Sequence, residues 1–162
     1  MPRVDSQQPL LPSVLDRLID REPDVSTEPA WRQSISLREL QTALLRDLEA
    51  LLNTRQKTPP LPADFQEARK SILAYGLPDF TAFGASSAEQ REVLRHAIES
   101  AIALFEPRLR EMQITLHAPA GEHDRTLRMT IDALLQVDPD PLPITFDTVV
   151  QPSSGTCQLH AK

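Results

Sequence analysis

Proline blocks decide where helices and strands can form in this chain. The sequence holds 15 Pro against only 4 Gly. Because proline lacks a backbone N–H and fixes φ, it interrupts both helices and sheet ladders. Regular structure is therefore expected between the blocks. Most of the prolines gather in four of them, which span residues 9–12, 23–29, 59–62 and 139–143.

The blocks also predict how the chain is divided. The first two fall within residues 1–34, which we interpret as a proline-rich N-terminal segment with a short helix near 13–20. At 162 residues the chain fits one domain with a core of its own, and that domain is assigned to residues 35–162. The sequence contains no internal repeat at the periods of solenoid proteins, so a repeat array is excluded.

Two long helices are predicted in the first part of the domain. Ser36 and Glu39 have the spacing of a capping box, and leucines then recur at helical intervals. Ser87 and Gln90 repeat this spacing and open a second helix, which ends before Pro107. The predicted buried faces are Leu37, Leu40, Leu44, Leu48, Leu51 and Leu52 in the first helix, and Leu94, Ala97, Ile98, Ala101, Ile102 and Phe105 in the second.

A shorter helix is predicted between them, from about Asp64 to Tyr75. Gly76 follows it, and glycine adopts the left-handed conformation of a helix stop more easily than any other residue. Pro78 then prevents the helix from continuing, so this end is well specified.

Beyond Pro107 the hydrophobic pattern changes from helical to alternating. Residues 112–117 and 126–133 alternate apolar and polar side chains, and the polar stretch between them favours an antiparallel hairpin. Residues 144–149 and 156–159 supply two further short strands. Helices followed by strands predict an α+β fold, with the N-terminal helices packed on one face of a small antiparallel C-terminal sheet.

Charge and hydropathy exclude several classes of partner. The net charge of −6 argues against a nucleic-acid partner, because such proteins usually carry a basic patch. No apolar run approaches the roughly 20 residues that cross a bilayer, so an integral membrane protein is not expected. The first residues lead into no secretory apolar region, and the single Cys157 can form no internal disulfide. A cytoplasmic location is therefore expected.

The residue patterns of common catalytic and metal sites are missing. The sequence has no glycine-rich phosphate loop and no Gly-x-Ser-x-Gly elbow. Cys157 lies in a strand-like pattern and is interpreted as a small core residue rather than a nucleophile. The histidines are scattered without metal-ligand spacing, so no metal and no cofactor is expected. These histidines are His96, His117, His123 and His160.

One charged corner stands out on electrostatic grounds. Glu106 lies at the C-terminal end of a predicted helix, where the macrodipole disfavours an acid by roughly 0.3 to 1 kcal/mol. It should therefore have a cationic partner. Pro107 fixes the backbone after it, so Glu106 and Arg108 form a rigid corner of opposite charges. Arg55 at the end of the first long helix is another candidate for the cationic partner of Glu106. A solvated helix end, which the pattern alone favours, remains the alternative to a functional corner.

At this corner the sequence resembles a known family. Glu106-Pro107-Arg108 is similar to the Glu-Pro-Arg motif of the TssE family and of related baseplate wedge proteins of contractile phages. The resemblance covers nearly the whole chain, with a departure at 151–155, where an acidic residue and a Thr-Gly turn are expected. Four other segments agree in the same order, namely 13–18, 45–55, 75–80 and 146–148.

The resemblance implies assembly rather than catalysis. TssE-like proteins are structural subunits of the type VI secretion baseplate, located beside TssF, TssG and TssK in its wedge, and their fold is similar to the inner domain of contractile sheath proteins. An open sheet edge would accept an extended arm of a first-ring sheath protein and so template sheath polymerisation. The corner of Glu106, Pro107 and Arg108 is then expected to bind partners.

Two alternatives stay open at this point. Related phage proteins have carried a lysozyme-like label, which suggests a glycoside hydrolase acting on peptidoglycan. That chemistry needs two carboxyl groups about 5 to 9.5 Å apart. Glu106 has no evident carboxylate partner, and the nearby Arg108 favours its ionised form, whereas a general acid must be protonated. The other alternative is a generic protein–protein adaptor domain.

Overall fold

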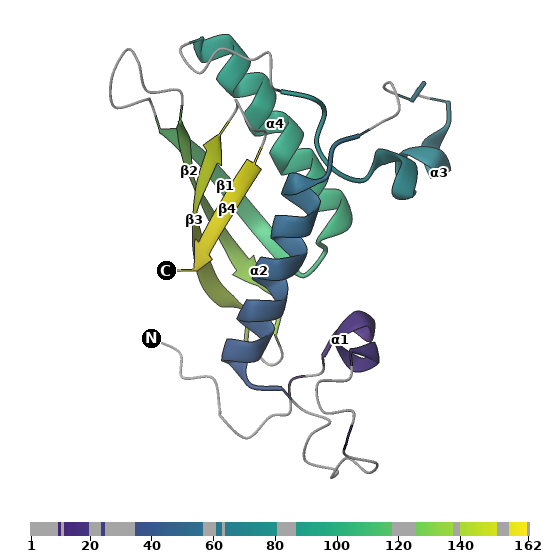
Figure 1. Cartoon of the computed structure of the whole chain (residues 1–162), viewed down its shortest axis with the longest axis vertical. Coiled ribbons are helices and arrows are strands. Elements are labelled where there is room, and N and C mark those ends of the chain that lie inside the picture. The colour runs from purple at the N-terminus through teal and green to yellow at the C-terminus, as the bar shows by residue number, and fades with distance from the viewer. Residues whose placement is uncertain are drawn as a thin grey trace.

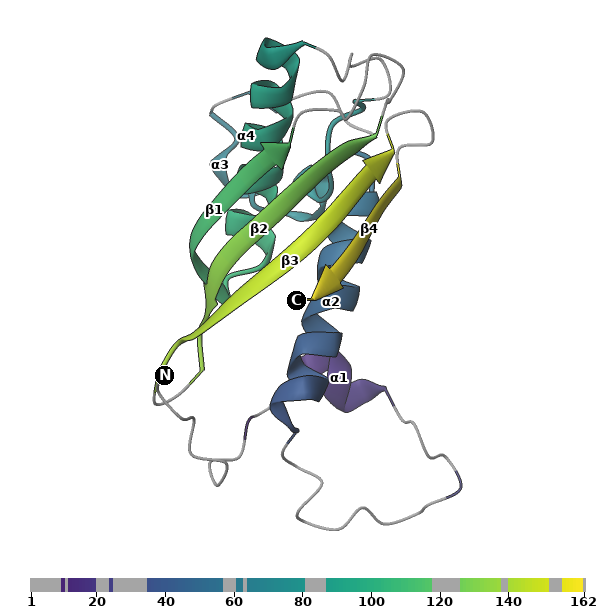
Figure 2. The ribbon, with the colours of Figure 1, turned by 90° about the vertical axis from the view of Figure 1, so that its left-hand side faces the viewer.

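A four-stranded antiparallel sheet carries two long helices on one face (Figure 1). Helices α2 (Leu37–Asn53) and α4 (Ala88–Phe105) form this layer, and Figure 2 shows the sheet in front of them. This arrangement confirms the α+β fold that was predicted from helices followed by strands. The computed structural model describes residues 10, 12–19, 24, 35–56, 61–62, 64–80, 87–117, 126–137, 140–151 and 156–161.

Both long helices begin where the capping residues predict. The Ser36 amide donates to the Glu39 carboxylate at 2.7 Å, and the Glu39 amide donates back to the Ser36 hydroxyl at 3.3 Å. The Ser87 hydroxyl accepts from the Gln90 amide at the start of α4. The buried residues of the two helices are Leu40, Ala43, Leu44, Leu48, Leu51 and Leu52 in α2, and Leu94, Ile98, Ala101 and Ile102 in α4.

The shorter helix predicted over 64–75 is wrong as a single element. It is divided into α3 (Gln66–Arg69) and the 3₁₀ helix η2 (Ile72–Ala74). The Ser71 hydroxyl lies between them, donating to the Ala68 carbonyl at 2.7 Å and accepting from the Leu73 amide at 3.3 Å. Such local side-chain bonds compete with the helical ladder and explain the break.

Gly76 has the positive φ that its position predicted. Its φ is 99°, on the side of the backbone map that L side chains rarely adopt. A Cβ at this position would lie 2.3 Å from the Thr54 carbonyl oxygen, and the next amide, that of Leu77, donates to the same oxygen at 2.8 Å. Glycine therefore lets this turn pack directly against the end of α2.

The sheet has the order β1-β2-β3-β4, so β1 and β4 form its two edges. All neighbouring strands are antiparallel, which confirms the predicted pairing of the first two. The predicted loop at 119–124, including His123, lies outside the described residues, as do 152–155 of the family departure and large parts of the proline blocks. The strands are β1 (Leu109–His117), β2 (Leu127–Leu135), β3 (Leu142–Gln151) and β4 (Thr156–Ala161).

A β-bulge near the start of β1 changes which side chains of that strand face the helices. Leu109 and Ile114 are both buried although they are an odd number of residues apart, which a regular strand does not allow. The register shifts between Arg110 and Gln113, and Glu111 within the shift has φ 48°. One additional residue turns both apolar side chains toward the helices. The alternation recognised in the sequence starts at Met112, inside this shift, so it does not include Leu109.

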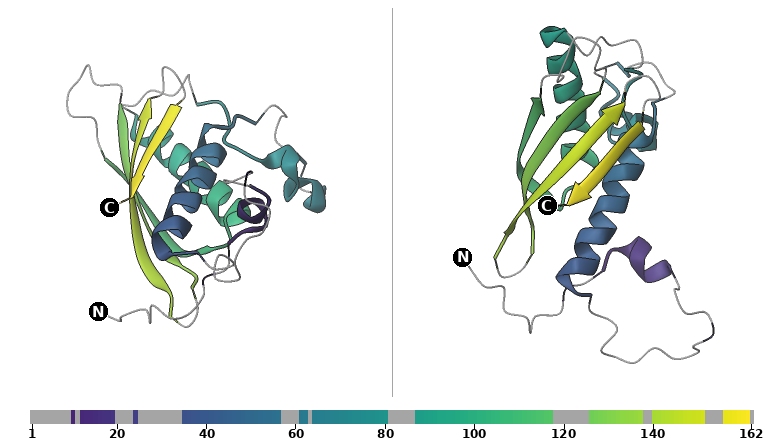
Figure 3. Two further views of the ribbon diagram at one scale, coloured as in Figure 1. Left: turned by 60° about the horizontal axis from the view of Figure 1, so that its bottom comes forward. Right: turned by 60° about the vertical axis from the view of Figure 1, so that its left-hand side comes forward.

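A short helix, α1 (Val14–Leu18), lies on the side of α2 that faces away from the sheet (Figures 1 and 3). Ser13 caps it, and its side chain accepts from the Asp16 amide. A backbone bond from the Ile35 amide to the Leu10 carbonyl, 2.9 Å long, gives this N-terminal part of the chain a second attachment.

Candidate functional site

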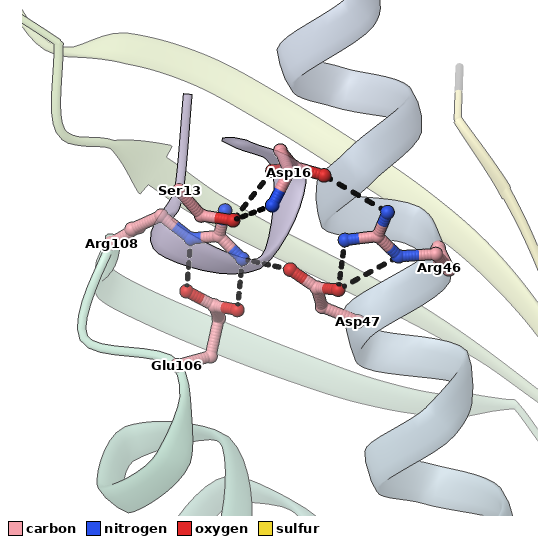
Figure 4. Close-up of polar contacts among 6 residues, drawn as sticks. All are labelled: Ser13, Asp16, Arg46, Asp47, Glu106 and Arg108. Atoms are coloured by element: carbon pink, nitrogen blue, oxygen red, sulfur yellow. Dashed lines mark hydrogen bonds and ion pairs between the residues drawn. The ribbon is translucent and has the colours of Figure 1, made fainter. Parts of the chain in front are cut away.

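The Glu106–Arg108 corner lies where α4 ends and β1 begins. Glu106 is only 5% exposed, and both of its carboxylate oxygens accept from one guanidinium group (Figure 4). Arg108 Nε donates to Oε1 at 2.5 Å and Nη2 donates to Oε2 at 2.6 Å. This fork-shaped pairing is the strongest kind of side-chain ion pair. The solvated helix end favoured by the sequence pattern is therefore wrong, and the predicted cationic partner is Arg108.

Backbone bonds fix this corner to both layers of the fold. The Glu106 amide donates to the Ile102 carbonyl at 2.8 Å and closes the last turn of α4. The Leu109 amide donates to the Glu106 carbonyl at 3.1 Å, and the Gln136 amide donates to the Arg108 carbonyl at 2.8 Å. The helix end, the turn and the end of β2 thus determine where the two charged side chains meet. Pro107 between them is exposed.

Asp47 is a member of this site that sequence reasoning missed. It lies on α2, and its Oδ2 accepts from Arg108 Nη2 at 2.7 Å. The residue belongs to a segment that carried the family resemblance, but a helical pattern cannot tell which distant corner a polar side chain will meet. Arg55, the other candidate partner of Glu106, instead forms an ion pair with Asp79 at 3.7 Å.

Arg46 extends the ion pairs to the N-terminal helix. Its Nε and Nη2 donate to Asp47 Oδ1 at 3.0 and 2.7 Å, and its Nη1 lies 2.9 Å from Asp16 Oδ1 on α1. Ser13 donates to the other Asp16 oxygen at 2.6 Å. A continuous polar chain therefore runs from α1 across α2 to the corner (Figure 4).

The ionisation of this cluster follows from its contacts. Hydrogen bonding to Glu106 raises the pKa of the Arg108 guanidinium despite burial, with a further contribution from Asp47. Hydrogen bonding to Asp47 likewise raises the pKa of Arg46. Burial alone would raise the pKa of the Asp16 carboxyl, but hydrogen bonds from Ser13 and Arg46 and the Arg46 charge lower it below its ordinary value.

One donor in the cluster is unused. Arg108 Nη1 is buried and has no hydrogen-bond acceptor among the described residues. Buried polar atoms are nearly always paired, so an orphaned donor of this kind needs an explanation. The other two nitrogens of the same group are fully engaged with Glu106 and Asp47.

The cluster supplies two carboxylates but not a hydrolase site. Glu106 and Asp47 both accept from the same Arg108 nitrogen, so each already has a cationic partner. A glycosidase instead keeps its carboxyl groups apart on either side of a cleft. Burial raises the pKa of the Cys157 thiol to about 11, which leaves it protonated and weakly nucleophilic near neutral pH. Among the described residues no group of three or more His, Cys, Asp and Glu side chains is arranged to hold a metal.

The two sheet edges differ in how their backbone groups are covered. At the β4 edge, Asn53 of α2 donates to the Cys157 carbonyl at 2.9 Å and accepts from the Cys157 amide at 2.8 Å. The Leu159 amide donates to Glu49 Oε1 at 3.2 Å. Within the part of the chain that the structure describes, no strand pairs with the outer side of β1.

A groove of about 510 Å³ runs between that open edge and α4. Its helical wall is mainly charged, and Arg95 there bonds both Glu92 and Glu99 at 2.9 Å. No described helix is long and apolar enough to cross a membrane. The groove is lined by Ala88, Arg91, Glu92, Arg95, Glu99 and residues 112–116.

Comparison with known proteins identifies the family. A family model described as baseplate wedge protein gp25 matches residues 38–140, which include Asp47 and the Glu106–Arg108 corner. A chain in a solved structure described as "The baseplate complex from the type VI secretion system" is 17% identical, with a TM-score of 0.49, and the match covers 70% of this chain and 96% of that one. No curated protein matches significantly. The family match spans more than half of the chain and confirms the predicted resemblance to baseplate wedge proteins and the predicted role as a structural baseplate component. The chain therefore belongs to the family of baseplate wedge protein gp25.

Proposed function

We propose that this chain is the TssE-type subunit of a type VI secretion baseplate in the cytoplasm. It joins a wedge with TssF, TssG and TssK and templates polymerisation of the sheath by pairing one sheet edge with an arm of a first-ring sheath protein. The observation that carries this proposal is the contrast between the two edges. Side chains of α2 bond outward backbone groups of the β4 edge, whereas no strand among the described residues pairs with the β1 edge, which begins one residue after Arg108.

The closed edge directs an incoming strand to β1. Proteins commonly cover sheet edges to prevent unwanted pairing, and the Asn53 and Glu49 side chains do so for β4. The bulge before Gln113 interrupts the start of β1, so its regular pairing surface is residues 113–117. An added strand would lie there beside the charged wall of α4.

The strand register identifies the backbone groups that such a strand would use. Backbone groups point alternately to the two sides of a strand, and those of Cys157 and Leu159 point outward to α2. The register of the four strands carries this alternation from β4 to β1. By this register, the amides and carbonyls of Ile114 and Leu116 point toward the open edge. Their side chains face the helices, so pairing would not disturb the core.

The corner supports the same interface through its exposed parts. Pro107 is exposed, and the Arg108 side chain, one residue before β1, is 26% exposed although its unused donor Nη1 is buried. Glu106 is buried and would act by holding the guanidinium in position. In this proposal Pro107 and Arg108 contact the partner, and Glu106 orients Arg108.

A proline substitution tests the open edge. Leu116→Pro removes an outward backbone donor and fills the path of the added strand, whereas Leu116→Ala trims the same side chain and keeps the donor. Both variants would be expressed in the source bacterium with a fluorescent sheath protein, after thermal melts of the purified proteins. We expect sheaths with Leu116→Ala and none with a folded Leu116→Pro. Normal sheaths with Leu116→Pro would refute pairing at β1.

A further inference from the structure

Helix α1 is attached by its polar side and presents its apolar side to solvent. Asp16 points to Arg46 on α2, while none of the helix residues is buried. Val14 and Leu18 are 75% and 76% exposed. Val14, Leu15 and Leu18 fall on one side of the helix, and Ile19 follows directly as its C-cap residue. This apolar stripe consists of Val14, Leu15, Leu18 and Ile19.

The orientation is the reverse of an ordinary surface helix. An amphipathic helix normally buries its apolar side and turns its charges to water, because burying apolar area is the main source of stability. Here the contacts of Ser13 and Asp16 hold the polar side of the helix toward α2 and leave its apolar side exposed. The attachment therefore keeps the stripe accessible to something other than this domain.

We infer that the apolar stripe of α1 is an anchor that inserts into an apolar groove on another subunit of the baseplate wedge. This inference rests on the proposed function, because it assigns the occupant to the same assembly. Recognition of a helix by a groove depends on apolar side chains at such spacings. Val14 and Leu18, one turn apart, would provide the two deepest contacts.

The size of the stripe argues against a second copy as its occupant. Five residues of helix extend only about 7.5 Å, at 1.5 Å per residue. Two such stripes face to face cannot approach the roughly 1,000 Å² of total buried area that a stable interface needs. A groove that surrounds one stripe buries more of it, and a second contact on the same partner increases the effective concentration of the first.

The Glu106–Arg108 corner provides that second contact with the partner, because ion pairs within this chain connect it to α1. Asp16, Arg46, Asp47 and Arg108 connect α1 to the corner by ion pairs of 2.9 Å or less. The stripe and the corner are therefore fixed relative to each other, and one wedge partner can engage both.

Binding of the full-length chain to wedge subunits purified from the same bacterium tests the inference. The stripe variant is Val14→Ser with Leu18→Ser, and the control is Ile72→Ser in η2, which removes a side chain that is also mostly exposed (84%). The turn after η2 contacts the end of α2 through the Leu77 amide and the Thr54 carbonyl, whereas α1 is attached through Arg46. All three proteins should melt alike, because none of these side chains is buried. We expect at least a tenfold loss of affinity for the stripe variant and none for the control.

The outcomes separate this inference from the proposed function. If the unmodified chain binds no wedge subunit, the proposed function itself fails. If it binds and the stripe variant binds equally well, or the control loses as much affinity, only the role of the stripe is overturned. A dimer in sedimentation that the stripe variant dissociates would assign the stripe to a second copy and would also overturn the inference.

Discussion

Arg108 donates to Asp47 at 2.7 Å across 61 positions of sequence and so joins the α4–β1 corner to α2. The same guanidinium holds the buried Glu106. A charged corner predicted to serve mainly for assembly is therefore also a tertiary contact between elements. Removing either charge affects the fold, but by different amounts, because the partners left behind differ.

Arg108→Ala should destabilise the protein more than Glu106→Ala. The first leaves a buried carboxylate without a partner, and breaking a buried pair in this way costs about 3 to 5 kcal/mol. The second leaves Arg108 bonded to Asp47, and we expect a loss of about 1 to 3 kcal/mol. Urea unfolding of the two variants and the unmodified chain measures the difference. Equal losses would contradict this account of the corner.

Leu48→Ala should cost about 2 to 5 kcal/mol of unfolding free energy. Leu48 is fully buried in the middle of the α2 stripe, so truncation leaves a cavity in the core. Leu45 is only partly buried on the same helix, and Leu45→Ala is the matched control with a smaller loss. The measurement is the denaturant concentration at the midpoint of unfolding, compared among proteins whose unfolding free energy depends equally steeply on denaturant concentration. A loss below about 1 kcal/mol for Leu48→Ala would contradict the assigned core.

Local patterns were sufficient to predict the main elements. The capping pair Ser36 and Glu39, the leucine stripe after it and the Ser87 cap are short-range signals, and α2 and α4 begin where they indicate. The alternation beyond Pro107 likewise predicted the strands, because one side of the sheet faces the helices and the other faces water.

Features that depend on distant contacts were not predicted. The bulge at Glu111 exists because both Leu109 and Ile114 must face the helices, and the alternation itself shows no extra residue. Asp47 meets Arg108 only once α2 and the corner pack together. The burial of Glu106 follows from the same packing, so the sequence could suggest a cationic partner but not the exclusion of water.

The attachment of α1 should depend on pH. The pKa of Asp16 is lowered below the ordinary value of 3.8 for this carboxyl, so its contribution to the attachment is complete above about pH 4 and is lost as the pH falls through the lower pKa of the folded state. A fluorophore on Leu18→Cys would report this, since the buried Cys157 thiol with a pKa of about 11 reacts slowly. We expect anisotropy to stay constant from pH 8 to about 5 and to fall below about 4.

Two controls complete that experiment. Asp16→Asn in the labelled protein should give low anisotropy already at neutral pH, because the Arg46 ion pair is lost. Circular dichroism at each pH separates release of α1 from global unfolding. An Asp16→Asn protein that titrates like its parent would contradict the role of Asp16 in holding the helix.

Purified protein should release no reducing ends from peptidoglycan. Glu106 and Asp47 are paired with Arg108 and are not available as a separate acid and nucleophile. Lysozyme serves as the positive control, and Glu106→Gln as the matched variant. Release that disappears in Glu106→Gln would establish the hydrolase alternative.

Arg108→Lys should separate the corner's role in assembly from its role in the fold. Lysine keeps the positive charge near Glu106 and Asp47, so the protein should stay folded with a smaller loss than in Arg108→Ala. It lacks the planar fork and therefore cannot hold Glu106 with two bonds while presenting the exposed part of a guanidinium to a partner. We expect a folded variant that forms few or no sheaths in the source bacterium, whereas Arg55→Lys, which alters an exposed pair away from the corner, should form them normally. Normal sheaths with Arg108→Lys would show that the guanidinium serves only the fold.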